Sequence, residues 1–266
     1  MNLANKIILK TSGPLGEIGT EYFTLADDYI TSKILQNGSY QFEISKFFAD
    51  QLKNLDMSNV TFIDAGAHFG FITIQFLNLV KDKFNRFRNI LLIEANPSIF
   101  GFLKENLSLF SKKLPILFLN IALHPFYDKI ILHKSRLNSG NTTYNRRNIK
   151  FFNRMGKFSI ASKSLDFILN DFQGPIFLKL DIQGLDLDSL YHLSENNWNK
   201  IHCIVFEWPG IPPKSYLVDF FISKFIGFDV SNSHHIEPIP HKFLHHHLNF
   251  RYGADIDYFL SRKKAY

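Results

Sequence analysis

The chain has 266 residues, a formal net charge of +6 and a single cysteine, Cys203. This length suits one large α/β domain, and 45% hydrophobic with 20% charged residues excludes a disordered polyelectrolyte. One cysteine excludes an intramolecular disulfide framework and a cysteine-based zinc site. No apolar stretch approaches the roughly 20 residues of a membrane span, and residues 1–10 lack the pattern of a signal peptide. We therefore expect a cytoplasmic protein.

The expected elements fall into two parts along the chain. Residues 1–57 form an N-terminal extension with an amphipathic helix, because apolar side chains recur at helical spacing from Ile44 to Leu55. From residue 58 to 266, short apolar runs alternate with helical stretches. The expected strands are 60–64, 90–94, 116–121, 176–181, 201–206, 228–230 and 256–261, and the expected helices are 69–81, 99–110, 186–193 and 214–225. Since continuous apolar runs indicate strands buried on both faces, we predict a doubly wound, mostly parallel seven-stranded Rossmann-like sheet with helices on both faces.

One stretch, residues 124–163, breaks this alternation. Strand patterns at 129–133 and 158–161 enclose the polar residues 138–141, which predicts an inserted β-arm. No acidic residue lies between Asp128 and Asp166, and the interval holds nine positive charges: Lys129, Lys134, Arg136, Arg146, Arg147, Lys150, Arg154, Lys157 and Lys163. The positive excess of the whole chain therefore belongs to this insertion, either as a site for an anionic acceptor or as a solvated basic loop.

A glycine turn follows the strand expected at 60–64. The sequence from Asp64 to Gly70 reads D-A-G-A-H-F-G and opens directly into a helix, which differs from the G-x-G-x-x-G of dinucleotide sites. A carboxylate at the strand end suits the ammonium of an amino-acid moiety and would repel a pyrophosphate. This pattern favours S-adenosylmethionine over NAD, the alternative being an ordinary glycine turn. Glu94 ends the next strand, where a carboxylate can accept hydrogen bonds from both ribose hydroxyls.

Charged residues also interrupt the strand expected at 176–181. Lys179 and Asp181 are two positions apart and so share one face of a central strand. Burying either charge alone costs several kcal/mol, so we expect them to pair with each other or with a substrate. Glu207 ends the following strand and brings a second carboxylate to the same edge. The alternative is a structural ion pair beside a solvated glutamate.

Several of these segments, in this order and spacing, resemble the FkbM family of class I, S-adenosylmethionine-dependent O-methyltransferases. The segments are residues 28–43, 62–70, 94–97, 120–123, 164–166 and 178–184. The resemblance implies that residues 58–266 are the methyltransferase domain and that S-adenosylmethionine is the cofactor. The implied site residues are Asp64, Gly66, His68 and Gly70 around the methionine part, Glu94 and Asn96 at the ribose and neighbouring adenine edge, Asn120 and Ala122 along the adenine, and Lys179, Asp181 and Gln183 at the reaction centre.

The hypothesis is methyl transfer to a hydroxyl of a carbohydrate or other small natural product, including a phosphate-bearing or acidic one. Asp181 is the first candidate for the base or acceptor-orienting group, Lys179 would compensate its charge, and Glu207 and His68 are further candidates. No metal site is assigned, although two strand-end carboxylates, Asp181 and Glu207, would suit a divalent cation. A homo-oligomer stays open.

Two alternatives belong to other functional classes. The basic charge suggests a nucleic-acid methyltransferase, but the sequence D-I-Q-G from Asp181 to Gly184 is not the Asn/Asp-Pro-Pro-Tyr type expected for base amino-methylation, and no RNA-binding module is recognisable. A non-catalytic binder with the same fold is the second alternative. The presence of Asp64, Glu94 and Asp181 argues against it.

The segment 234–247 holds six of the eleven histidines: His234, His235, His241, His245, His246 and His247. His241 and His245 have the one-face helical spacing of a zinc or nickel chelate, but Glu237 is the one acidic residue near enough to complete a site. We expect a polar loop over the acceptor pocket.

Overall fold

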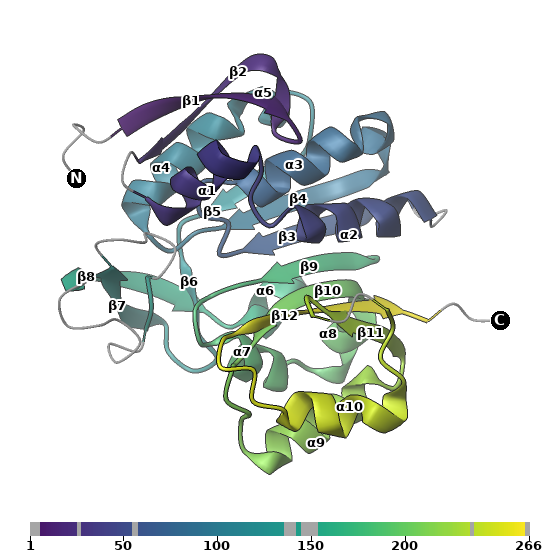
Figure 1. Ribbon diagram of the computed structural model, residues 1–266. Helices are drawn as coiled ribbons and strands as arrows, with labels where there is room; N and C mark the ends of the chain where they lie inside the picture. The colour runs from purple at the N-terminus through teal and green to yellow at the C-terminus, as the bar shows by residue number, and fades with distance from the viewer. Residues whose placement is uncertain are drawn as a thin grey trace.

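The structure, a computed structural model, describes residues 6–25, 28–54, 58–135, 142–144, 154–234 and 237–263. Seven strands of this described chain form a central sheet: β3 (Val60–Ala65), β4 (Phe87–Ile93), β5 (Ile116–Leu119), β9 (Ile176–Leu180), β10 (Ile201–Trp208), β11 (Phe228–Asn232) and β12 (Ile256–Arg262). Their order is β11-β12-β10-β9-β3-β4-β5, and all neighbours are parallel except the two pairs that β12 makes. This sheet, with helices on both faces (Figure 1), confirms the doubly wound, mostly parallel α/β fold.

Side chains alternate between the two faces of the central strands, as the period of a β-strand requires. Phe62 and Leu92 belong to one apolar core, whereas Ile63 and Ile93 belong to the core on the other face. The helices of the first face are α2 (Phe42–Asn54), α3 (Phe71–Leu79), α4 (Pro97–Asn106) and the short α5 (Ser108–Ser111), with the 3-10 helix η2 (Lys81–Arg86) following α3. The helices of the second face are α6 (Leu165–Asn170), α7 (Asp186–Tyr191), α8 (Glu195–Lys200), α9 (Ser215–Phe225) and α10 (His241–Asn249). The helices and strands expected after residue 58 are present, with ends within a few residues of the prediction.

The N-terminal extension contains more than the expected helix. Two antiparallel strands, β1 (Lys6–Gly13) and β2 (Gly16–Leu25), form a hairpin that the sequence analysis did not predict, and α1 (Tyr29–Asn37) follows it. The amphipathic helix is confirmed as α2. Tyr22 and Ile30 are buried in the same apolar core as Phe62 of β3. The extension and the sheet therefore share one core, and the domain boundary at residue 57 stays a prediction from sequence.

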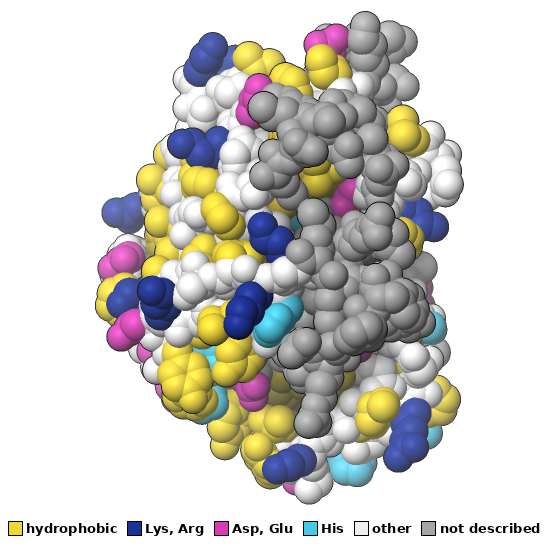
Figure 2. Space-filling view, turned by 90° about the vertical axis from the view of Figure 1, so that its left-hand side faces the viewer, with side chains coloured by type: hydrophobic (Ala, Val, Ile, Leu, Met, Phe, Trp, Pro, Cys, Tyr) yellow, Lys and Arg dark blue, Asp and Glu magenta, His cyan; other side chains and the backbone are white. Residues whose placement is uncertain are grey.

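The predicted β-arm is present in the residues that the structure describes. It consists of β6 (Ala122–Leu123), β7 (Lys129–Ser135) and β8 (Arg154–Lys163), in the order β6-β8-β7, beyond the carboxyl edge of the central sheet (Figure 1). The polar residues 138–141 and the charges Arg136, Arg146, Arg147 and Lys150 lie outside the described residues. Among the described charges, Lys163 pairs with Asp128 at 3.1 Å. The Lys and Arg side chains coloured in Figure 2 are separated by apolar and uncharged surface.

The histidine-rich segment differs from the expectation of a loop. Residues from His241 onward form helix α10, because Leu244 and Leu248 recur at helical spacing and are buried in the second core beside α9. His241, His245 and His246 are exposed, and His235 lies outside the described residues. The loop prediction is wrong because two buried leucines, and not the histidines, decide the conformation. Across the described ranges, no helix is both long and apolar enough to cross a membrane.

Candidate active site

A cavity opens at the carboxyl edge of the sheet, where β3 and β9 lie side by side. From β3 the strands continue to β4 and β5 on one side, and β9 and the later strands lie on the other side of β3. The strand order therefore reverses between β3 and β9. The cavity, here called the first cavity, is lined by the turns after β3, β4 and β9, by the turn before α2 and by the β-arm. The predicted site residues that line it are Gly66, His68, Glu94, Ala122, Lys179, Asp181 and Gln183. The predicted residues that do not line it are Asp64, Gly70, Asn96, Asn120 and Glu207.

Two glycines of the turn after β3 are required by close packing within the protein. Gly66 has φ +78°, and a Cβ atom there would lie 1.8 Å from the main-chain oxygen of Asp181. Gly70 has φ +85°, and a Cβ atom there would lie 2.8 Å from side-chain carbons of Leu103 and Leu107 on α4. Gly66 thus lets the turns after β3 and β9 touch, whereas Gly70 lets α3 begin against α4.

Behind the cavity wall lies a buried ion pair. The Lys179 Nζ atom is 3.2 Å from Asp64 Oδ1 and 3.8 Å from Asp181 Oδ2, and it donates a 2.8 Å hydrogen bond to the Gly66 carbonyl. Thr73 donates to the other Asp64 oxygen at 2.6 Å. Burial lowers the pKa of Lys179, but the charges of Asp64 and Asp181 outweigh it and raise the pKa to about 12. The expected pairing of Lys179 with Asp181 is confirmed, with Asp64 as a third, fully buried member.

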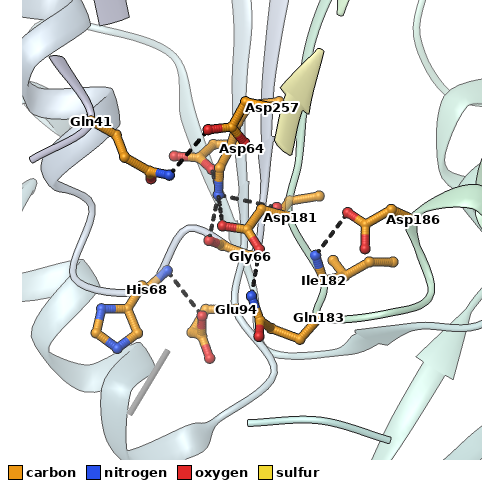
Figure 3. Close-up of polar contacts among 12 residues, drawn as sticks. Gln41, Asp64, Gly66, His68, Glu94, Asp181, Ile182, Gln183, Asp186 and Asp257 are labelled. Carbon is orange, nitrogen blue, oxygen red and sulfur yellow. Dashed lines mark hydrogen bonds and ion pairs between the residues drawn. The ribbon is translucent and has the colours of Figure 1, made fainter. Parts of the chain in front are cut away.

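Glu94 is held at the cavity by two main-chain groups. One carboxylate oxygen accepts from the His68 N–H at 2.9 Å (Figure 3), and the other accepts from the Asn96 N–H at 2.7 Å. Burial raises the pKa of Glu94 to about 7, against these hydrogen bonds. Asn96 caps α4 by accepting from the Ser98 N–H, and Asn120 donates to the Glu94 carbonyl at 2.7 Å. These two asparagines position the turn that carries Glu94.

The turn after β9 brings Asp181 to the cavity with 29% of its side chain exposed. Its N–H donates to the Ala65 carbonyl at 3.1 Å, which joins it to β3. Gln183 Nε2 donates to Asp181 Oδ1 at 2.9 Å, and Gln183 itself has φ +57°, a left-handed conformation that is uncommon outside glycine. Figure 3 shows this amide at the Asp181 carboxylate, and Lys179 approaches the other oxygen of the same carboxylate. Asp181 is therefore held from two sides.

A second cavity adjoins the first at Gln183, which lines both. It is bordered by the β-arm residue Thr143, by Pro209 and Ile211 after β10, and by Leu217 of α9. Its acidic lining residues are Asp186, Asp188, Glu207 and Asp255, and its described lining includes no lysine or arginine. The second cavity is therefore lined by acidic side chains.

Carboxyl groups crowd this side of the site and hold protons. Burial, with neighbouring carboxylates, raises the pKa of Glu207 to about 9 and those of Asp186 and Asp257 to about 7. Asp257 stands opposite Glu207 in the antiparallel pair of β10 and β12, and Gln41 donates to it at 3.4 Å. By contrast, burial lowers the pKa of His68 to about 4.

The sequence analysis missed Gln41, Thr143 and Asp257 at this edge. They come from the turn before α2, from the β-arm and from the last strand. A charged residue within the apolar run 256–261 was the available signal for Asp257, but its pairing with Glu207 follows from the strand register. In the part of the chain that the structure describes, no group of three or more His, Cys, Asp or Glu side chains is arranged to hold a metal ion.

The family model of the methyltransferase FkbM domain matches residues 64–252, which is more than half of the chain. The chain belongs to the FkbM methyltransferase family. Methyltransferases of this family depend on S-adenosylmethionine, and the predicted cofactor is thereby confirmed. A comparison with curated proteins finds no significant match.

Solved structures of several methyltransferases are similar to this FkbM-family chain. The methyltransferase FkbM from Methylobacillus flagellatus KT is 14% identical, with a TM-score of 0.46. The match covers 77% of this chain and 44% of that protein, so this chain spans less than half the length of that protein. The S-adenosylmethionine-dependent methyltransferase from Agrobacterium tumefaciens has 10% identity and a TM-score of 0.43 over 99% of this chain and 72% of its own. TrmK from M. capricolum, in complex with S-adenosylhomocysteine, has 13% identity and a TM-score of 0.38 over 83% of this chain and 69% of its own.

The residues around the first cavity fit S-adenosylmethionine. Each Glu94 oxygen accepts one main-chain N–H, so each retains a lone pair for a ribose hydroxyl. Next to Glu94, the apolar side chains of Ile93, Ala95, Ala122 and Leu123 line the cavity and suit the face of a purine. The partly exposed carboxylate of Asp181 lines the same cavity.

Proposed function

We propose that this FkbM-family chain transfers the methyl group of S-adenosylmethionine to a hydroxyl of a carbohydrate or other small natural product. The observation that carries the proposal is the placement of Asp181: its partly exposed carboxylate lines the first cavity and accepts a hydrogen bond from Gln183, the residue that lines both cavities. When bound, the cofactor supplies a methyl group on a positively charged sulfur, already activated for displacement. The protein has to align the acceptor hydroxyl with that methyl group and take up its proton.

In this proposal the first cavity holds the cofactor. Glu94 binds the ribose hydroxyls, and Asn96 and Asn120 keep its turn in place through hydrogen bonds to the main chain. Gly66 and His68 border the methionine part. Asp64 acts from behind the wall, because it is fully buried and bonded to Lys179 and Thr73. Gly70 supports the turn by letting α3 start against α4.

The second cavity receives the acceptor. Its carboxyl groups can accept hydrogen bonds from a polyol, and Asp181 at its border orients the reacting hydroxyl and takes its proton as the new bond forms. Lys179 holds the carboxylate of Asp181 in place and compensates its charge. Glu207, with a pKa raised to about 9 by burial and neighbouring carboxylates, holds a proton at neutral pH and donates a hydrogen bond to the acceptor. His68 stays a neutral imidazole beside the reaction centre.

The charges around the site suit an acceptor with two chemically different parts. The acidic second cavity suits a neutral, hydroxylated group, since an anion would be repelled there. A phosphate or acidic group elsewhere on the acceptor would contact the basic β-arm. Neutralising Arg146, Arg147, Lys150 and Arg154 together should then raise the KM for such an acceptor steeply at low salt and leave cofactor affinity unchanged. An unchanged KM would reduce these charges to a role in solubility.

The decisive test uses the variants Asp181→Asn and Asp181→Ala. We expect both to bind S-adenosylhomocysteine within about threefold of the wild type by calorimetry, because Asp181 is proposed to act on the acceptor. The rate of methylation of a panel of hydroxylated acceptors, measured by the transfer of labelled methyl groups, should fall by about 10²–10⁴-fold, which is the usual contribution of a general base. Full turnover by these variants would contradict the assignment. A wild-type chain that binds neither S-adenosylmethionine nor S-adenosylhomocysteine would contradict the function itself.

A further inference from the structure

The buried side chain of Thr143 links the described part of the β-arm to the catalytic turn. Only 2% of this residue is exposed. Its main chain pairs with His133 of β7 in both directions: the His133 N–H donates to the Thr143 carbonyl at 2.9 Å, and the Thr143 N–H donates to the His133 carbonyl at 3.1 Å. Thr143 is therefore a fixed part of the arm, with a side chain directed at the central sheet.

The hydroxyl of Thr143 donates a 2.9 Å hydrogen bond to the main-chain carbonyl of Gln183. Gln183 is held at φ +57°, in a region that residues with a Cβ atom seldom adopt, and Gly184 follows at φ +95°. The peptide between these two residues has little intrinsic preference for its orientation because glycine accepts many conformations. Two hydrogen bonds hold this peptide: the Gly184 N–H donates to Asp186 at 3.2 Å, and the Gln183 carbonyl accepts the shorter bond from Thr143.

The same residue, Gln183, carries this restraint to Asp181. Its side-chain amide donates to Asp181 Oδ1 at 2.9 Å, so a shift of its main chain would move the donor away from the carboxylate. Lys179 approaches the other oxygen, Oδ2, at the longer distance of 3.8 Å. Of these two contacts to Asp181, the Gln183 amide is thus the short one, and it depends on the conformation of the turn.

The surrounding segment lies between the two cavities. Thr142 lines the first cavity, Thr143 lines the second, and Gln183 lines both. We propose that Thr143 is a positioning residue for methyl transfer: the inserted β-arm, through the Thr143 hydroxyl, holds the Gln183 turn so that its amide orients Asp181. This inference rests on the proposed function of Asp181. The β-arm would then position an active-site turn, in addition to contributing basic side chains.

The test compares Thr143→Val, which has nearly the same shape but no hydroxyl, with Thr143→Ser, which keeps the hydroxyl. We expect Thr143→Val to lower kcat by about tenfold, the effect of one lost hydrogen bond to a group that stays buried. The affinity for S-adenosylhomocysteine should stay within about threefold. Thr143→Ser should restore kcat to within about threefold of the wild type. Equal losses in the two variants would mean that Thr143 acts only by packing, and an unchanged kcat in Thr143→Val would overturn the inference.

A double-mutant cycle isolates the route through Gln183. In a Gln183→Ala background the amide is absent, so adding Thr143→Val should lower kcat by no more than about twofold further. A second full tenfold loss would show that Thr143 acts by another route and would contradict the proposal.

Hydrogen exchange provides a readout that needs no acceptor. Amides of residues 181–184 should exchange faster in Thr143→Val than in the wild type or Thr143→Ser, because the carbonyl restraint on this turn is lost. Unchanged exchange would overturn the inference even if the methyltransferase assay succeeds. Failure of the wild-type chain to methylate any acceptor, with the exchange difference present, would instead count against the proposed function alone.

Discussion

The two sides of the active site differ in how their polar groups are satisfied. On the β3–β4 side, Asp64 is paired with Lys179, and both oxygens of Glu94 accept main-chain N–H groups. On the β9–β10–β12 side, the pKa values of Asp186, Glu207 and Asp257 are raised first by burial and then by the nearby carboxylate of Asp181. The Asp186 oxygens also accept from the Ile182 and Gly184 N–H groups.

This difference separates a preformed site from one that needs a ligand. A pocket whose groups are already hydrogen-bonded costs little reorganisation when it binds the same molecule in every cycle. A crowded set of carboxyl groups instead gains most from an acceptor that brings hydrogen-bond donors to it. We therefore assign the cofactor to the first side and the acceptor to the second, and the following variants test that division.

The largest effect is expected from Gly66→Ala, because Gly66 lies where the turn after β3 contacts the turn after β9. The added Cβ would lie 1.8 Å from the Asp181 carbonyl, and the backbone at φ +78° disfavours alanine as well. Binding of S-adenosylhomocysteine, measured by calorimetry, should weaken by more than about 100-fold, with a clear fall in melting temperature. The control is Gly101→Ala in α4, where the Cβ meets nothing within 4 Å and stability should rise slightly. Wild-type affinity in Gly66→Ala would refute the contact.

Lys179→Met should rank next, because it leaves Asp64 buried without its cation. We expect a loss of about 3–5 kcal/mol in the free energy of unfolding, measured by urea denaturation. The double variant Asp64→Asn/Lys179→Met removes both charges and should recover much of that loss. Lys46→Met, at an exposed i,i+4 pair with Asp50 on α2, should change stability by less than about 0.5 kcal/mol. Equal effects at the two lysines would show that burial does not matter to the pair.

Glu94→Gln tests the cofactor side through its pH dependence. The charged carboxylate is the better acceptor for ribose hydroxyls, and burial raises the pKa of Glu94 to about 7. Affinity for S-adenosylhomocysteine should therefore increase as the pH rises from 6 to 8 in the wild type. In Glu94→Gln the affinity should be about 10–100-fold lower at pH 8 and flat with pH. A wild-type affinity without pH dependence would contradict the role of the carboxylate.

The smallest effect concerns stability on the acceptor side. Glu207 keeps its proton up to a pKa of about 9 in the folded chain, whereas an ordinary glutamate loses it near 4.5. Between these values the folded state binds more protons than the unfolded state, so the free energy of unfolding falls as the pH rises. In Glu207→Gln, the decrease in the free energy of unfolding between pH 5 and 9 should be smaller by only about 1 kcal/mol, since water partly screens the half-buried side chain. Denaturation at pH 5, 7 and 9 measures it, and a rise in stability with pH would reverse the assignment.

Local sequence patterns predicted the helices and strands whose formation depends on residues close together in the chain. Apolar runs of strand length predicted β3, β4, β9 and β10 because a strand buried on both faces has to be apolar throughout. The helical spacing at 99–110 predicted α4, which begins two residues earlier because Asn96 caps it and Pro97 fits its first turn. The β1–β2 hairpin was missed because neither of its strands shows a long apolar run, and α10 was missed because its histidines concealed two leucines at helical spacing.

The sequence by itself determined the turn chemistry of this protein: a carboxylate and glycines after β3, a glutamate after β4, and a lysine two residues before an aspartate at β9. These residue types and spacings favoured S-adenosylmethionine over NAD, and the resemblance of the segments that carry them indicated the family. The tertiary structure alone decided which groups meet. It placed Asp64 behind the cavity wall, set Glu207 opposite Asp257 and joined Thr143 to Gln183 across 40 positions. Such contacts depend on strand register and on the path of an insertion, which no local pattern encodes.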